Sequence, residues 1–448
     1  MKIYNDKDIK IIDENLSIIQ KKGEREKALR NDPTIDEYKK VIKVIIEFIK
    51  NKKRIIYGGM CWNELLKNKT NNKVFFYDEY DLSDYEFYSF EPLVDLKELC
   101  DILHNKGFKK VEGVDAFHEE TYTIRVNYMP YCDITYMPKI IYNKLKPIKI
   151  NGLNYTPFNF LLIDIFRMFN DPLDSFWRLE KNGKRALLLF KYYDLQINDK
   201  FTKIKYNTNI LDYIRKDIII NSNFIVIGYY AIDYYRYIST NENKELYTPY
   251  YEIITDTLDN NVDKINDQLT KKFGDKIRKE EYHPYFQFFD KKFVFYYENN
   301  IILIVYGNNE KCVPYKRLEE KKINIGSYNI VLMYLLINSN YYYNQNNKIE
   351  KQNTDFFIKS LITYRNNFLT KNNKSPLDNT PFEEFILQCL GQNIPSDKKF
   401  FMQIDQTNKE FNRKIRIRYK AETPKGDFSK LKFANSSGNK KDNKQKKE

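Results

Sequence analysis

Residues 54–66 read RIIYGGMCWNELL, and this stretch decides the fold expected for the first part of the chain. The apolar run that ends at Gly58 predicts a short buried strand, and the residues that follow Gly59 predict a helix. Where a strand passes through glycines into a helix, backbone N–H groups and the positive end of the helix lie together, so a phosphate group can bind there. Asn63, in the first turn of this helix, is expected to add a side-chain contact to that phosphate site.

Residues 83–89 read SDYEFYS and predict the next strand. Because side chains alternate along a strand, Asp84 and Glu86 are expected on the same face. Two carboxylates on one face repel each other unless cations neutralise them. A third acid, Asp133, lies in the apolar segment YCDIT (131–135), which predicts a neighbouring strand. The three acids are therefore candidate ligands for two Mg²⁺ or Mn²⁺ ions, since such hard ions prefer carboxylate oxygens.

Plainer explanations exist for each of these patterns. A Gly-Gly turn alone is a weak signal, and an Asp-x-Glu pair on a strand is often no more than a solvated edge. The neighbouring acids Asp78, Glu79 and Asp81 are rival candidates, but their segment lacks strand alternation and is expected to be a solvated loop. Asp84 and Glu86 are preferred because apolar residues continue their strand.

The second half of the chain repeats this layout. Residues 224–228 read FIVIG, a second strand that ends in a glycine, and residues 251–255 read YEIIT, which matches YEFYS at 85–89. Two further strand segments, an Ile-Gly turn at 323–326 and an apolar helix follow in the same order as in the first copy. Self-similarity over this length predicts a duplicated domain, and a chance match between unrelated segments is the alternative.

The second copy keeps one of the three acids in this alignment. Glu252 matches Glu86, Tyr250 matches Asp84, and Leu303 matches Asp133. Because two of the three metal ligands are lost, the second copy is expected to be catalytically inactive.

The chain is basic, with 75 Lys and Arg against 61 Asp and Glu in 448 residues and a formal net charge of +14. This excess is typical of proteins that bind polyanions, and a merely solvated basic surface is the alternative. Residues 414–420 (KIRIRYK) alternate strictly and predict a strand with one basic face. Four residues on that face are candidates to hold a polyanion backbone without reading its sequence: Lys414, Arg416, Arg418 and Lys420.

Several classes of protein are disfavoured by the sequence. The N-terminus MKIYNDKDIKII is charged from its second residue, and no apolar run approaches the length of a membrane span, so neither secretion nor membrane insertion is expected. The five cysteines are scattered and never spaced as Cys-x-x-Cys, which predicts reduced thiols in a cytosolic compartment. The three histidines are too few and too dispersed for a zinc site or for a nucleophile-histidine relay.

Three motifs, IIYGGMCWN (55–63), SDYEFYS (83–89) and CDIT (132–135), resemble those of the poly(A) polymerases of large cytoplasmic DNA viruses. Those proteins are members of the DNA polymerase β-like nucleotidyltransferase superfamily. The resemblance covers residues 40–195 well, and it covers residues 220–340 as a degenerate repeat that this viral branch also carries.

The resemblance implies roles for the motif residues. Gly58 and Gly59 match the phosphate-binding turn, and Asp84, Glu86 and Asp133 match the catalytic metal ligands. The superfamily usually has Ser after the first glycine and often Asp at the second carboxylate, so Gly59 and Glu86 are departures, although both variants occur in the viral branch. The glycines and the carboxylates are also further apart in the sequence than in compact family members. Membership of another group of nucleotidyltransferases is therefore the alternative.

A later helical segment, FWRLEK (176–181) followed by KR (184–185), resembles the helix that lies beside the nucleotide in this family. A basic residue there would neutralise the triphosphate, and a solvated helix face is the alternative for each of them. The nucleotide-binding candidates on this helix are Arg178, Lys181, Lys184 and Arg185.

The activity implied by the resemblance is template-independent transfer of AMP from ATP to RNA 3′ ends, supported by two Mg²⁺ or Mn²⁺ ions. The resemblance also implies a homodimer without a membrane anchor, acting in the host cytoplasm or viral factory, with packaging in the virion as a further possibility. Uridylyl transfer or second-messenger synthesis is the alternative enzyme activity. A non-catalytic RNA-binding or processivity subunit is the alternative without catalysis.

The fold class expected is α+β, with two tandem nucleotidyltransferase-like domains, the first catalytic and the second degenerate, and with helical elements at both ends. The expected divisions are an N-terminal helical region at 1–53, a catalytic domain at 54–200, a degenerate domain at 201–345, C-terminal helices and the basic strand at 346–420, and a disordered basic tail at 421–448.

Overall fold

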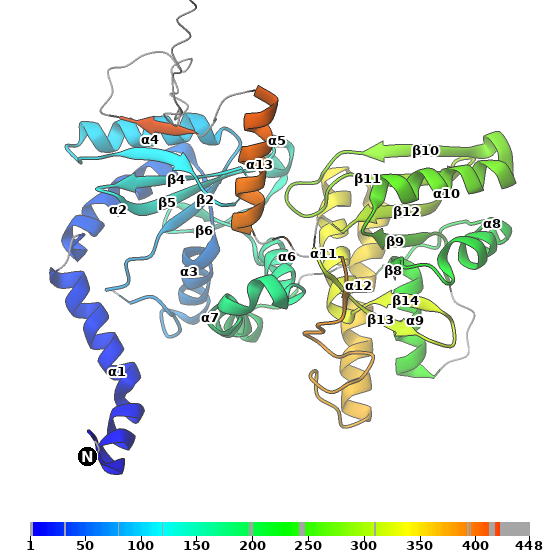
Figure 1. The fold of residues 1–448 in the computed structure, drawn as a ribbon, viewed down its shortest axis with the longest axis horizontal. Coiled ribbons are helices and arrows are strands. Elements are labelled where there is room, and N and C mark those ends of the chain that lie inside the picture. Colours follow the sequence, from blue (N-terminus) through cyan, green and yellow to red (C-terminus); the bar gives the residue numbers. More distant parts are fainter. Residues whose placement is uncertain are drawn as a thin grey trace, which may run out of the picture. The chain divides into compact units, whose positions relative to one another are not determined.

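The computed structural model describes residues 3–30, 33–78, 80–118, 120–195, 197, 200–241, 247–308, 311–391, 394, 396–411 and 417–421. The chain forms two compact units (Figure 1). The first unit comprises Met1–Thr156 with Ser396–Glu448, and the second unit comprises Pro157–Pro395.

The first unit is built around an eight-stranded sheet with the strand order β16-β3-β4-β5-β2-β1-β7-β6. Its central pairs β2–β5 and β1–β7 are parallel, whereas β1–β2 and β4–β5 are antiparallel. The strands are β1 (Ile55–Tyr57), β2 (Tyr85–Ser89), β3 (Glu112–Asp115), β4 (Thr121–Val126), β5 (Met129–Tyr136), β6 (Ile148–Ile150), β7 (Leu153–Tyr155) and β16 (Arg418–Lys420).

The helices of the first unit are α1 (Asp6–Arg30), α2 (Ile35–Lys52), α3 (Gly58–Thr70), α4 (Pro92–Asn105), α5 (Lys139–Lys144) and α13 (Ser396–Phe411). α2 begins at Ile35, where the hydroxyl of the preceding Thr34 accepts a hydrogen bond from the Glu37 N–H. α1 extends away from the rest of its unit in Figure 1, and Ala28 is its one buried residue.

α2 and α4 cover one face of the first sheet and leave the opposite face to the acids. Phe48 of α2 packs against Phe87 of β2, with 6.2 Å between ring centroids. Leu96 of α4 lies so close to Gly113 that a Cβ there would come within 2.5 Å of it. Since side chains alternate, Glu86, next to Phe87, points to the opposite face, called the acidic face below.

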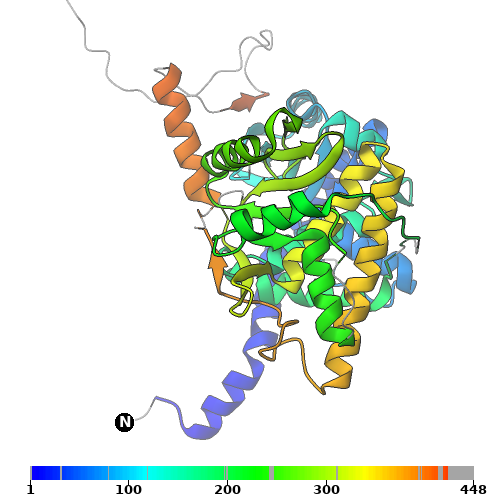
Figure 2. The same ribbon diagram turned by 90° about the vertical axis from the view of Figure 1, so that its right-hand side faces the viewer.

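The second unit holds a second eight-stranded sheet, with the order β10-β11-β12-β9-β8-β14-β13-β15. Figure 2, in which this unit faces the viewer, shows α9 in green beside the long α12 in yellow-orange. The strands are β8 (Ile225–Ile227), β9 (Tyr251–Thr255), β10 (Ile277–Tyr282), β11 (Lys292–Tyr297), β12 (Asn300–Gly307), β13 (Val313–Leu318), β14 (Ile323–Gly326) and β15 (Cys389–Leu390).

The α-helices of the second unit are α6 (Phe158–Phe169), α7 (Pro172–Tyr192), α8 (Thr208–Tyr213), α9 (Gly228–Thr240), α10 (Leu258–Phe273), α11 (Tyr328–Asn344) and α12 (Lys348–Lys371). A π-helical turn at Ile214–Ile219 and a 3₁₀ turn at Gly274–Lys276 complete the elements.

The two sheets share one strand order. Seven strands in a row, β3-β4-β5-β2-β1-β7-β6, correspond to β10-β11-β12-β9-β8-β14-β13. The α+β fold with two related domains is therefore confirmed. One detail of the predicted alignment is wrong: Glu86 lies opposite Asp133, and Glu252 lies opposite Ile304, so Ile304 rather than Leu303 takes the place of Asp133.

The C-terminal part of the second unit differs from expectation. Within the region 346–420, expected to hold helices and one basic strand, residues 381–390 contain no helix, and Cys389 and Leu390 form β15 against β13. A disulfide joins Cys312 to Cys389, so the expectation of reduced thiols is wrong for these two residues. Both differences come from contacts between residues far apart in the sequence, which local periodicity does not encode. Cys61, Cys100 and Cys132 are buried free thiols.

The first unit ends earlier than the catalytic domain expected at 54–200. α6 and α7 pack with the second unit: the Asn170 amide donates to the Asn329 carbonyl over 3.1 Å, and Lys311 bonds Asp171 over 2.9 Å. Helices that follow the first sheet in sequence are thus part of the second compact unit.

No helix among the described residues is long and apolar enough to span a membrane.

Candidate active site

The three predicted metal ligands lie on neighbouring positions of the acidic face. Glu86 on β2 and Asp133 on β5 are direct partners across a parallel strand pair, and Asp84 comes one residue before β2. Asp84 is exposed, while Glu86 and Asp133 are half-buried. Two strands that pair side by side therefore bring together acids that are 47 residues apart in the sequence.

The electrostatics of Asp133 reflect this crowding. Burial, and after it the negative charge of Asp84, raise the pKa of the Asp133 carboxyl to about 6, against the hydrogen bond from Thr123 and the charge of Arg125, which lower it. A carboxylate that ionises reluctantly beside other acids is stabilised by a bound cation. The donor chemistry thus fits Mg²⁺ or Mn²⁺.

The side chains of Asp84, Glu86 and Asp133 do not form a complete metal site in this structure. Among the described residues, no group of three or more acids, histidines or cysteines is arranged to hold a metal ion. Glu86 Oε2 instead accepts a hydrogen bond from the Gly59 N–H over 3.1 Å.

The glycine turn is built closely around Glu86. Gly58 has φ = +67°, and a Cβ at this position would lie 1.6 Å from Glu86 Oε2. A Cβ at Gly59 would lie 2.4 Å from the hydroxyl of Tyr77. Position 58 therefore favours glycine because of its left-handed backbone conformation. A side chain at Gly59 would displace the Tyr77 hydroxyl, which lies at the end of its side chain.

Asn63 is fully buried, and its side chain holds a loop. Its Oδ1 accepts hydrogen bonds from the backbone N–H groups of Phe76 and Tyr77 over 3.0 and 3.1 Å, and its Nδ2 donates to Glu64 over 3.2 Å. Asn63 thereby positions Tyr77 against the glycine turn. A direct contact between Asn63 and a nucleotide remains a prediction.

The rival acids lie in a loop, as the sequence predicts. Asp78 and Asp81 are exposed, and Asp81 accepts a hydrogen bond from the Asp78 N–H over 2.7 Å. Glu79 lies outside the described residues.

Hydroxyl groups line the acidic face beside the carboxylates. Thr123 on β4 lies opposite Asp133 and donates a 2.6 Å hydrogen bond to its Oδ1. Thr135, two residues further along β5, shares hydrogen bonds with Tyr57 (2.6 Å) and Thr121 (2.9 Å). Sequence reasoning missed Thr123. The alternation of TYTIRV at 121–126 could have placed it on the same face as the acid, once the strand pairing was known.

The basic residues predicted on the nucleotide helix lie on α7, in the second unit. Lys184 forms an ion pair with Glu180 at 2.6 Å, and both side chains are exposed. Arg178 is half-buried and donates to the Ser175 hydroxyl over 3.2 Å, and burial lowers the pKa of its guanidinium. Lys181 is exposed, and Arg185 is half-buried. The cations of α7 are thus in different environments.

The predicted basic strand is described from residue 417 on. β16, at the edge of the sheet, pairs with β3. Arg418 bonds the Glu112 carboxylate over 2.7 and 2.9 Å, so this cation is neutralised within the first unit. Lys420, the other described member of the basic face, is exposed. Lys414, Arg416 and the tail from 422 lie outside the described residues.

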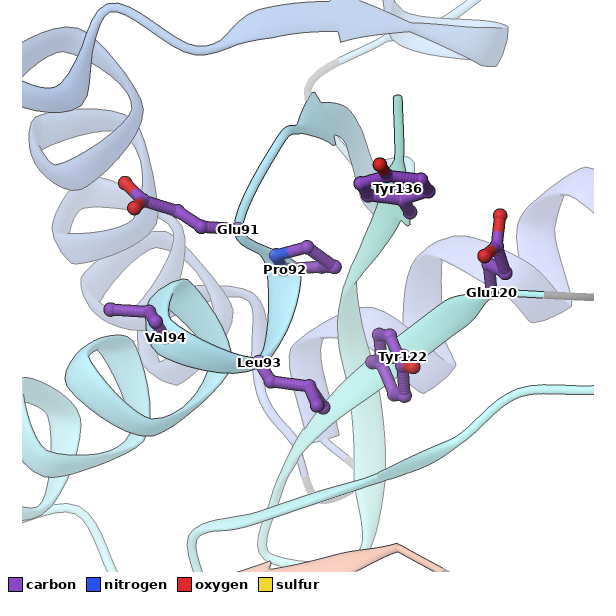
Figure 3. A pocket seen from close by; sticks show the side chains of 7 residues that line it. All are labelled: Glu91, Pro92, Leu93, Val94, Glu120, Tyr122 and Tyr136. Carbon is purple, nitrogen blue, oxygen red and sulfur yellow. The ribbon is translucent and has the colours of Figure 1, made fainter. Parts of the chain in front are cut away.

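A pocket of about 270 Å³ opens on the other face of the same sheet (Figure 3). Tyr136 is three residues beyond Asp133 on β5, so it points to the opposite side. This pocket is therefore separate from the acidic face. It is lined by Glu91, Pro92, Leu93, Val94, Glu120, Tyr122 and Tyr136.

Two family models match the chain. The model described as "Poly(A) polymerase catalytic subunit" matches residues 43–175, and the model described as "APMV, Putative poly(A) polymerase, catalytic subunit, C-terminal" matches residues 188–447.

Relatives and a solved structure agree with these matches. The "Putative poly(A) polymerase catalytic subunit" of Acanthamoeba polyphaga mimivirus is 33% identical over 98% of this chain and 83% of the relative. The protein of the same description from African swine fever virus (strain Badajoz 1971 Vero-adapted) is 32% identical over 38% of this chain and 36% of its own length. The structure titled "Crystal structure of the Megavirus polyadenylate synthase" has a TM-score of 0.88 and 31% identity, and the match covers 95% of this chain and 89% of that one.

Proposed function

This chain belongs to the family of poly(A) polymerase catalytic subunits, and on that premise we propose that it adds AMP from ATP to RNA 3′ ends without a template. It is a nucleotidyltransferase. The observation that carries the proposal is the position of Asp84, Glu86 and Asp133 on one face, beside the turn at Gly58.

The residues of the acidic face have two roles in this proposal: the acids bind metal ions, and Thr123 orients one of the acids. Asp84, Glu86 and Asp133 would hold one or two divalent ions. When bound, Mg²⁺ or Mn²⁺ lowers the pKa of the attacking 3′-hydroxyl and stabilises the leaving pyrophosphate. Thr123 holds the Asp133 carboxylate in place through its 2.6 Å hydrogen bond.

The phosphates of ATP would bind at the start of α3. The turn at Gly58 and Gly59 presents backbone N–H groups, and the positive end of the helix dipole lies behind them. The Gly59 N–H already binds a carboxylate oxygen of Glu86, which supports an affinity of this turn for anions. No protein nucleophile is required, because the RNA hydroxyl attacks the α-phosphorus directly.

Basic residues would neutralise the remaining phosphates of the substrates. On α7 these are Arg178, Lys181, Lys184 and Arg185. Near the C-terminus, Lys414, Arg416 and Lys420 would hold the RNA backbone without reading its sequence, whereas Arg418 is already paired with Glu112. Such contacts make RNA binding weaken steeply with salt.

The experiment that tests this function is primer extension by the purified protein with each of the four NTPs, in Mg²⁺ or Mn²⁺. We expect extension of a short RNA primer with ATP and release of pyrophosphate. Equal or better use of UTP would identify a uridylyltransferase instead. Products made from NTPs without a primer would indicate second-messenger synthesis.

The working form of the enzyme is proposed to be a homodimer, acting in the host cytoplasm or viral factory and packaged in the virion. The family membership supports this, and sedimentation of the purified protein tests the dimer. A monomer at the concentrations used for activity would contradict it.

A further inference from the structure

The outer face of α7 exposes large apolar side chains that no described residue of the second unit covers. Leu173, Phe176, Trp177 and Leu187 are 51%, 71%, 71% and 62% exposed. Their spacing of three or four residues, together with the ten from 177 to 187, places them on one side of the helix. The inner side is packed: Ala186 and Leu189 are fully buried in the second unit.

Lysines share this outer face. At 100° per residue, Lys181, Lys184 and Lys191 lie on the same side of α7 as the exposed rings, and all three are exposed. The one acid on this face, Glu180, is paired with Lys184 at 2.6 Å. The face therefore combines two aromatic rings with an excess of positive charge.

The position of Trp177 is supported from within the helix. The Arg178 guanidinium lies 5.7 Å from the centroid of the Trp177 ring, a cation–π contact. Arg178 is itself anchored by its hydrogen bond to Ser175, which is fully buried. The exposed Trp177 ring is thus in contact with an arginine that is itself anchored in the helix.

We propose that Phe176 and Trp177 are a stacking platform for bases of the RNA substrate, with Lys181 and Lys184 contacting the flanking phosphates. The proposal rests on the RNA substrate of the proposed function. Exposed aromatic rings beside lysines match the chemistry of a single strand, which has flat bases joined by charged phosphates. Base stacking depends little on which base is bound. It therefore suits an enzyme that holds RNA without reading its sequence.

The chain carries its own reporter for this proposal. It has two tryptophans, and Trp62 is buried whereas Trp177 is exposed. In a Trp62→Phe variant all tryptophan fluorescence comes from position 177. Titration with single-stranded oligo(A), without ATP or metal ions, is expected to quench this emission because a base stacks on the indole. An abasic strand of the same length and charge is expected to leave it unchanged.

Affinity measurements extend the test to the wild-type background. We expect Trp177→Ala and Phe176→Ala to weaken oligo(A) binding about 5- to 150-fold each, the range for loss of one stacked base. In primer extension both variants should raise the KM for RNA and leave kcat and the KM for ATP unchanged. Leu187→Ala is the matched control, since Leu187 is an exposed apolar residue of the same face without a ring.

Three results would overturn the proposal. One is unchanged oligo(A) affinity in both ring variants. Another is a changed KM for ATP with an unchanged KM for RNA, which would assign the rings to the nucleotide. The third is a shift in oligomeric state in sedimentation of Trp177→Ala, which would assign the face to a second copy of the chain.

Failure of the platform and failure of the proposed function are separable. Quenching by oligo(A) requires no catalysis, so it would still support the platform if the wild-type protein added no AMP. Efficient tailing by a Trp177→Ala protein with wild-type RNA affinity would remove the platform and leave the polymerase function intact.

Discussion

The two sheets have the same strand order, but the corresponding face is accessible to solvent in the first unit and buried in the second. In the first unit Asp84 is exposed and Glu86 and Asp133 are half-buried. At the corresponding positions of the second unit, Tyr250, Glu252 and Ile304 are all buried. One copy keeps its acids accessible, and the other has turned the same surface into core.

The glycine–glutamate pair survives in both copies. Gly228 has φ = +62°, close to the +67° of Gly58. A Cβ at Gly228 would lie 2.2 Å from Glu252 Oε1, as a Cβ at Gly58 would lie 1.6 Å from Glu86 Oε2. Because the pair persists where the aspartates are gone, it is a requirement of the strand–turn–helix fold. The two aspartates are what distinguishes the site from its copy.

The second unit neutralises its remaining glutamate with a fixed cation. Lys292 of β11 is buried, and its charge interacts with Glu252 and Glu350. Its ammonium lies 4.0 Å from the ring centroid of Tyr341 and 5.1 Å from that of Phe289. Lys292 thus supplies positive charge on the face that corresponds to the acidic face of the first unit.

Two helices close over this face of the second unit. Asn338 of α11 donates to the Glu252 carboxylate over 3.4 Å, and Tyr306 donates to it over 3.2 Å. Glu350 of α12 accepts a hydrogen bond from Tyr250 over 3.4 Å. The second copy thus differs from the first in what covers this face as well as in its acids.

The largest expected effect comes from exchanging the acids of the two copies for neutral residues. Asp84→Ala or Asp133→Ala should lower the rate of AMP addition about 10³-fold or more, because metal-ion stabilisation of charge contributes several kcal/mol. Glu252→Gln, which neutralises the one acid that the second unit keeps at the corresponding positions, should keep the wild-type rate. The measurement is primer extension at saturating ATP and RNA, with thermal unfolding as a check on folding. Comparable losses of rate from changes in both units would contradict the assignment of catalysis to the first unit.

Removal of the internal cation should destabilise the second unit strongly. Lys292→Met leaves the buried Glu252 and Glu350 without their cation and should lower the free energy of unfolding by about 3–5 kcal/mol. Adding Glu252→Gln to this variant should restore part of the loss. Urea unfolding measures both. Lys279→Met on the neighbouring strand β10 is the control. It removes a lysine whose partner, Asp263 of α10, is exposed, and it should change stability by about 1 kcal/mol or less. A Lys292→Met protein as stable as wild type would show that the cation is dispensable.

The pH dependence of stability should carry the signature of the buried glutamate. Burial raises the pKa of Glu252 to about 7 from its ordinary 4.5, so between these values the folded state binds more protons than the unfolded state, and stability falls as the pH rises. Glu252→Gln cannot ionise. Its free energy of unfolding relative to wild type should therefore increase by up to roughly 3 kcal/mol from pH 4.5 to 7.5. A difference that stays constant over this range would contradict the assignment.

The smallest expected effect concerns the hydroxyl that supports Asp133. Thr123→Val removes the hydrogen bond to this carboxylate and should lower kcat/KM about tenfold, equivalent to about 1.4 kcal/mol. Thr121→Val is the matched control on the same strand and face, since its hydroxyl bonds Thr135 and not an acid. Equal effects of the two changes would mean that Thr123 acts through packing alone.

Local patterns made several elements predictable. β2 at Tyr85–Ser89 and β9 at Tyr251–Thr255 coincide with the strand segments expected from the sequence. The turn at Gly58 could be predicted because its steric requirement is local. The structure of residues 381–390 could not be predicted. It depends on pairing with β13 and on a disulfide between cysteines that are 77 residues apart in the sequence.

The sequence by itself determined the order of strands and helices, the duplicated layout and the identity of the acids, because periodicity and glycine sterics act over a few residues. The tertiary structure alone decided the register that sets Asp133 beside Glu86, the burial of Lys292 near Glu252, and the exposure of Trp177. Each of these depends on which distant segments pack together, and that choice is made by the burial of whole surfaces, which no short stretch of sequence encodes.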